Sequence, residues 1–119
     1  MPRVLAIGLD PAFADYSTMP GLTPELVLAY IDSQLQRLRG MGYEVEGCMV
    51  NPDAWEDAVV SHLGTVEFDC ILIGAGLRDP ARLLLLEKLL NLVHARAPRA
   101  KLCFNTTPAD SAEAVRRWA

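Results

Sequence analysis

Apolar and polar residues follow two patterns along this chain, and the two patterns alternate. Short runs rich in branched apolar residues are typical of strands buried on both faces of a parallel sheet. Four such runs occur, at residues 3–9, 43–50, 69–73 and 100–105. Between them, apolar residues recur at helical spacing within residues 23–40, 53–64 and 81–97, and again after residue 110. The pattern predicts a strand followed by a helix, four times over.

Polar, proline and glycine residues mark the ends of the predicted helices. Thr23 and Pro24 supply a capping hydroxyl and a proline in the first turn, and Gly40 and Gly42 end the same helix. The other three helices are predicted to begin at acidic residues. These starts are Asp53 with Glu56, Asp79 with Pro80, and Asp110 with Glu113.

Strands that alternate with helices form a parallel sheet, because each crossover helix returns the chain to the same edge. We therefore expect an α/β fold with three layers, in which a four-stranded parallel sheet carries helices on both faces. The expected strand order is 2-1-3-4. The chain shows no internal repeat and no low-complexity linker, so residues 1–119 are predicted to form one domain.

The third predicted helix has a wide apolar face. Its apolar residues cover about half of the helix circumference, which exceeds what packing on a sheet requires. They are Leu83, Leu85, Leu86, Leu89, Leu90, Leu92 and Val93. Either this helix lies near the centre of the fold, or the margin of its apolar face meets a partner. A homodimer through helix 81–97 or through an edge strand is therefore one expectation.

The composition is that of a globular protein and narrows the set of partners. Hydrophobic residues make up 51% of the 119 residues, charged residues make up 22%, and the formal net charge is −4. An acidic chain without a basic cluster favours neither nucleic acid nor an anionic membrane as a partner. Met1 leads directly into a strand-like run, so we expect no signal peptide and no membrane-spanning stretch.

The cysteines agree with a cytoplasmic protein, which is the expected localisation. Cys48, Cys70 and Cys103 are odd in number, and each lies within a strand-like run. Inert core thiols are expected at all three positions. Cys103 is the one to test for reactivity, because it lies two residues before Asn105.

A ligand site is predicted at the carboxyl edge of the sheet. In an open parallel sheet, ligands bind where the strand order reverses, which here is between the first and third strands. Asp10 and the segment from Gly74 to Arg78 are expected to line this crevice, with Asn105 and Thr106 beside it.

The residues of the crevice suggest a small polar or anionic ligand. Gly74 and Gly76 would let backbone amides approach an anion, and Arg78 could grip a carboxylate or phosphate. The connection over residues 11–22 is long and has no periodicity, so it is either a lid or an ordered surface loop. As a lid it would bring Tyr16 and Ser17 over the ligand.

Several motifs that would specify a reaction or a cofactor are missing. The sequence from Gly74 to Asp79 begins like a dinucleotide fingerprint but has Asp79 in place of the third glycine. There is no Walker A lysine and no nucleophile elbow. His62 and His94 lack companions at metal-ligand spacing, so no metal site is predicted and the cofactor stays unknown.

One helical group could carry acid–base chemistry. Glu87, Asn91 and His94 are spaced i, i+4 and i+7 on the third helix, beside its apolar face. Such a group could place a carboxylate against an imidazole. The alternative is the solvated face of an amphipathic helix.

The order of strands and helices resembles that of flavodoxin-like domains and, among these, of the response-regulator receiver. The resemblance covers most of the chain and concerns architecture. It implies acidic residues after the first strand and a hydroxyl after the fourth, which Asp10 and Thr106 or Thr107 could supply. A receiver would have its phosphoacceptor aspartate where this chain has Gly74, and would add a fifth strand and a lysine. The resemblance implies at most a degenerate receiver-like interaction module.

Three functional hypotheses follow from these residues. The first is binding of a small polar or anionic ligand at the sheet edge, held by Arg78, Asn105 and Thr106. The second is a hydrolase or lyase with Asp10 as base, which requires Asp10 to bind more than its own loop. The third is an interaction module that acts as a dimer.

Overall fold

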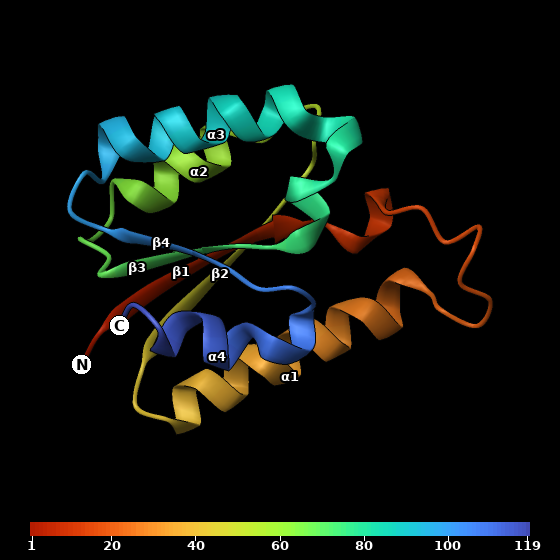
Figure 1. The fold of residues 1–119 in the computed structure, drawn as a ribbon, viewed down its shortest axis with the longest axis horizontal. Helices are drawn as coiled ribbons and strands as arrows, with labels where there is room; N and C mark the ends of the chain where they lie inside the picture. The colour runs from red at the N-terminus through yellow and green to blue at the C-terminus, as the bar shows by residue number, and fades with distance from the viewer.

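The computed structural model describes residues 1–119 and shows a four-stranded, wholly parallel sheet in the order β2-β1-β3-β4 (Figure 1). The strands are β1 (Arg3–Leu9), β2 (Glu44–Val50), β3 (Cys70–Ile73) and β4 (Lys101–Phe104). The helices are α1 (Pro24–Gly40), α2 (Glu56–Leu63), α3 (Leu83–Arg96) and α4 (Ser111–Arg116). Helices α1 and α4 cover one face of the sheet, and α2 and α3 cover the other (Figure 1). The predicted fold class and strand order are confirmed, and the architecture is compatible with a flavodoxin-like arrangement.

The pairing of the two central strands sets the position of the carboxyl edge. Ile7 in β1 lies opposite Cys48 in β2 and opposite Ile73 in β3. Both chain termini lie at the opposite, amino edge of the sheet (Figure 1). The connections that follow β1, β3 and β4 therefore gather at one end of the molecule.

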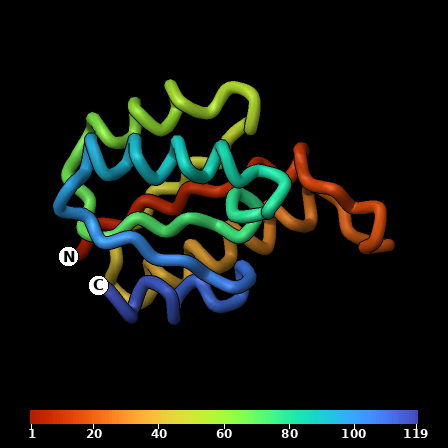
Figure 2. Tube along the Cα trace, turned by 45° about the horizontal axis from the view of Figure 1, so that its top comes forward, coloured from red at the N-terminus to blue at the C-terminus, as the bar shows by residue number.

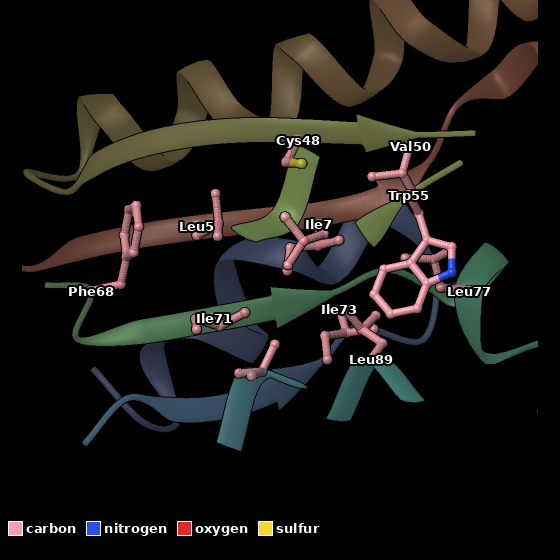
Figure 3. Packing of buried hydrophobic residues seen from close by; sticks show 12 residues of the cluster. Leu5, Ile7, Cys48, Val50, Trp55, Phe68, Ile71, Ile73, Leu77 and Leu89 are labelled. Carbon is pink, nitrogen blue, oxygen red and sulfur yellow. The ribbon is translucent and has the colours of Figure 1, made fainter. Parts of the chain in front are cut away.

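The sheet separates two hydrophobic cores. The core beneath α2 and α3 contains large side chains that meet across the sheet surface (Figure 3). They include Leu5, Ile7, Trp55, Phe68, Ile71, Ile73 and Leu89. The core beneath α1 and α4 combines leucines and valines with smaller residues, which are Ala6, Cys70, Cys103, Ala112 and Ala114. The buried aromatic side chains, Trp55 and Phe68, belong to the first core.

The predicted start of α1 is confirmed at atomic detail. The Thr23 hydroxyl oxygen accepts a hydrogen bond from the backbone N–H of Leu26 at 3.2 Å, with Pro24 in the first turn. Gly42 follows the helix with a φ of 100°, a backbone conformation that favours glycine.

The other predicted helix starts need correction. The Asp53–Glu56 capping box does not form, because α2 begins at Glu56 and its cap residue Trp55 makes no side-chain hydrogen bond. Asp79 caps a short 3-10 turn, Pro80–Arg82, and α3 begins only at Leu83. Around the last helix, the capping box joins Thr107 to Asp110 rather than Asp110 to Glu113.

The wide leucine face of α3 is divided between the core and the surface. Leu89 and Val93 are buried in the core beneath α2 and α3. At the first turn, Leu83 is 63% exposed and Leu84 is 74% exposed. The helix therefore lies on the surface of the domain, with two leucines uncovered at the end near the carboxyl edge of the sheet.

Residues 11–22 form a loop that projects with the start of α1 beyond the carboxyl edge of the sheet (Figure 2). The loop begins as a 3-10 turn, Pro11–Phe13, and the Tyr16 hydroxyl donates a hydrogen bond to the Pro11 carbonyl oxygen at 2.6 Å. Phe13 is 40% exposed. No helix of the structure is both long enough and apolar enough to cross a membrane.

Candidate functional site

A cavity of about 160 Å³ lies at the carboxyl ends of β1 and β3, on the face covered by α1 and α4. Gly8, Gly74 and Gly76 form the wall contributed by the strand ends. Opposite them, α1 contributes Val27, Ile31 and Gln34, and the loop after β1 contributes Pro11 and Ala14. This is the place where the strand order reverses, as the sequence-based topology required.

The chemistry of the cavity wall is mainly apolar and entirely uncharged. None of the residues that line it carries an ionisable side chain, and the polar side chains present are Gln34, Asn105 and Ser111. An ion that entered would lose its hydration without gaining an opposite charge. The cavity wall therefore supplies no charged side chain for the anion that the sequence suggested.

β1 packs tightly against Gly76 and less tightly against Gly74. A Cβ at Gly76 would lie 3.0 Å from the Cβ of Leu9, and a Cβ at Gly74 would lie 3.5 Å from the Cα of Gly8. The N–H of Gly74 donates to the Ile7 carbonyl oxygen at 2.9 Å. Close packing thus accounts for Gly76, whereas a Cβ at Gly74 would lie at an ordinary contact distance.

Arg78 holds the ends of β3 and β4 together. Its guanidinium donates to the Ile73 carbonyl oxygen at 2.8 Å, and to both the carbonyl oxygen and the side-chain oxygen of Asn105. The guanidinium carbon also lies 4.9 Å from the centre of the Phe104 ring. Burial lowers the pKa of Arg78 from its ordinary value. Arg78 lies outside the cavity lining, and three hydrogen bonds join its guanidinium to the chain itself.

Asn105 connects this arginine to the start of α4. The side chain is buried, with 5% exposure, and its amide donates to the Ser111 hydroxyl at 3.1 Å. Ser111 in turn donates to the Pro108 carbonyl oxygen at 2.8 Å. Asn105 and Ser111 therefore contribute polar groups to the cavity wall that already have partners.

Thr106 lies outside the cavity and binds the turn before α4. Its hydroxyl donates to the Asp110 carboxylate at 2.6 Å, and its N–H donates to the same carboxylate at 2.8 Å. The N–H of Thr107 adds a third contact at 3.2 Å. These hydrogen bonds, led by the Thr106 hydroxyl, lower the pKa of Asp110. The cluster fixes the turn whose Pro108 lines the cavity.

Three of the predicted ligand-binding residues lie after β1 and form hydrogen bonds within their own loop. They are Asp10, Tyr16 and Ser17. The Asp10 carboxylate accepts from the N–H of Ala12 at 3.0 Å, and the N–H of Ser17 donates to Asp15 at 2.9 Å. Tyr16 is bonded to Pro11, and desolvation raises the pKa of its phenol. The Asp10 carboxylate therefore binds only a backbone N–H of its own turn. A role for Asp10 as a catalytic base requires that it also bind a group outside its own loop, and the structure shows no such contact.

Neither histidine of the chain lines the cavity. No group of three or more His, Cys, Asp or Glu side chains is placed to hold a metal ion. On α3, the Asn91 amide donates to the backbone oxygen of Glu87 at 2.9 Å, and no hydrogen bond joins Glu87 to His94. His62 contacts Glu46 at 3.0 Å on the surface.

The thiol proposed for testing, Cys103, is buried against a second thiol. The sulfur atoms of Cys103 and Cys70 lie 3.3 Å apart beneath α1 and α4. The contact with Cys70, together with burial, raises the pKa of the Cys103 thiol. A protonated, covered thiol is a poor nucleophile.

Sequence reasoning missed the contribution of α1 to the site. Val27 and Ile31 belong to the apolar stripe of that helix, and Gln34 lies three residues beyond Ile31 on the same side. A polar residue on an apolar stripe is the signal that could have identified Gln34. Comparison of the chain with protein-family models and with curated proteins finds no match.

Proposed function

We propose that this domain binds a small, neutral and largely apolar molecule in the cavity between β1, β3 and α1. The observation that carries the proposal is the uncharged cavity at the point where the strand order reverses. Native protein interiors leave few voids larger than a water molecule, so an opening of this size at this position favours a binding role.

The volume limits the size of the ligand. An engineered apolar cavity of about 150 Å³ holds a benzene molecule. The cavity of about 160 Å³ therefore suits a ligand of about six to eight non-hydrogen atoms. This size excludes nucleotides and flavins from full burial in the cavity.

Thermal unfolding in the presence of matched probes tests the proposal. Benzene, toluene and phenol should raise the unfolding temperature, because a ligand that binds the folded state stabilises it. Inorganic phosphate and acetate should leave it unchanged. Stabilisation by phosphate alone would restore the anion hypothesis and overturn this one.

A pair of variants on α1 assigns the binding to the cavity. Val27→Phe places a larger side chain at the cavity wall and should abolish the stabilisation by benzene. Leu28→Phe is the matched control, because Leu28 is 41% exposed and does not line the cavity. Equal stabilisation of both variants would place the bound probe elsewhere.

Self-association is a second candidate function, supported by the uncovered first turn of α3. Leu83 and Leu84 there lie near Phe13, and these three apolar side chains border one surface hollow. A second copy of the chain could cover them, as in a degenerate receiver-like module. Light scattering should then show a dimer that Leu84→Glu converts to a monomer, and a monomer at high concentration would contradict this alternative.

A further inference from the structure

The amide oxygen of Gln34 is the one buried side-chain polar atom of the cavity wall that has no hydrogen-bond partner. Gln34 lines the cavity from α1, and its side-chain oxygen is buried without a hydrogen-bond partner. The other polar side chains of the wall, Asn105 and Ser111, are bonded to each other and to the chain around them. Among the side chains of the cavity wall, the one hydrogen-bonding group without a partner therefore belongs to Gln34.

A buried amide oxygen without a donor is unfavourable, and native proteins rarely retain one. The terminal torsion of a glutamine side chain is soft, so the oxygen can turn toward the cavity with little strain. An occupant that supplied a donor at this point would satisfy the oxygen in surroundings where hydrogen bonds are strong.

We infer that Gln34 selects ligands that carry a neutral hydrogen-bond donor, and that the ligand class is small alcohols, phenols included. The inference rests on the proposed function and narrows it. Ammonium donors are excluded because no acidic side chain lines the cavity, and carboxylates are excluded because they are charged acceptors. The hydroxyl of a small alcohol or phenol would donate a hydrogen bond to the Gln34 side-chain oxygen, and the apolar part of the molecule would fill the rest of the cavity.

Three probes of similar size separate donor selection from simple filling of space. Phenol carries a donor, anisole carries only an acceptor, and toluene carries neither. Calorimetric titration of the full chain should show phenol binding roughly tenfold more tightly than toluene, as expected for one net hydrogen bond. Anisole should gain nothing over toluene.

Variants of two glutamines on α1 locate the selection. Gln34→Met keeps the length of the side chain and removes the acceptor, so phenol and toluene should then bind equally. Gln36→Met is the matched control, because Gln36 is exposed on the same helix and lies outside the cavity. It should keep the roughly tenfold preference for phenol.

Each result has a distinct meaning. If none of the probes binds, the proposed function itself fails. If phenol and toluene bind equally to the unchanged protein, the cavity binds ligands but Gln34 does not select them, and this inference is overturned. Anisole binding as tightly as phenol would overturn it as well, because Gln34 would then present its N–H to the ligand. Since these comparisons use the unchanged protein, they hold even if Gln34→Met does not fold.

Discussion

The two faces of the sheet are built from side chains of different size. On the face covered by α2 and α3, Trp55, Phe68 and Leu89 fill the space between helices and strands (Figure 3). On the face covered by α1 and α4, leucines such as Leu38 pack with small residues such as Ala6 and Ala112, and no buried residue of that core is aromatic. The first face has a hollow at its amino end, beside Leu63, Phe68 and Ala97, whereas the second face has a cavity at its carboxyl end.

This difference separates two tasks within one small domain. Large buried side chains contribute most to stability, because both transfer from water and close packing scale with their size. Small side chains and the projecting start of α1 leave a space that the chain does not fill itself. The filled face accordingly stabilises the fold, and the incompletely filled face supplies the binding site that we propose.

Truncation of one large side chain on each face gives the largest expected effect. Leu89→Ala, on the filled face, should lower the free energy of unfolding by about 2–5 kcal/mol. Ile31→Ala, on the cavity face, should lower it by roughly 1 kcal/mol, because Ile31 is half-buried beside space that already exists. Urea unfolding of both variants measures the contrast, and equal losses would show that the two faces are equally packed.

Removal of the polar connection between β3 and β4 should have an intermediate effect. Arg78→Ala leaves the carbonyl oxygens of Ile73 and Asn105 without their donor, which should reduce stability by about 1–3 kcal/mol. Arg82→Ala is the control, because Arg82 makes only an exposed contact with the Phe13 carbonyl oxygen. An Arg78→Ala variant that unfolds like the unchanged protein but loses a phosphate-dependent stabilisation would instead support the ligand role predicted from the sequence.

The fold could be predicted from the sequence because its signals are local. Branched apolar runs mark the strands, and Thr23 with Pro24 marks the start of α1 before any tertiary contact is known. The starts of the other helices are less predictable. Asp79 caps a 3-10 turn rather than α3. Before α2, the side-chain oxygen of Asn51 accepts a hydrogen bond from the N–H of Asp53. An acid at the right spacing permits a capping box but does not require one.

The candidate site could be placed from the sequence but not described by it. Topology alone brings Gly74 and Asn105 to one edge of the sheet. Whether Arg78 faces a ligand or a carbonyl oxygen depends on where the end of β4 lies, which is a non-local property. The same is true of Gln34, since its position on the cavity wall depends on the packing of α1 against strands far away in the sequence.

The smallest expected effect is a pH dependence at the turn that supports the cavity wall through Pro108. The pKa of Asp110 is lowered in the folded protein, chiefly by the Thr106 hydroxyl. A lowered folded-state pKa contributes stability above the unfolded-state pKa, about 3.9 for aspartate, and this contribution is lost as the pH falls through the folded-state value. Because Asp110 is partly exposed to solvent, this contribution to the free energy of unfolding is less than about 1 kcal/mol.

In urea unfolding, Asp110→Asn should therefore be less stable than the unchanged protein at pH 7, and the difference should shrink below about pH 4. Thr106→Val, which removes the leading hydrogen bond, should weaken this pH dependence, whereas stability curves that stay parallel from neutral to acidic pH would contradict the assignment.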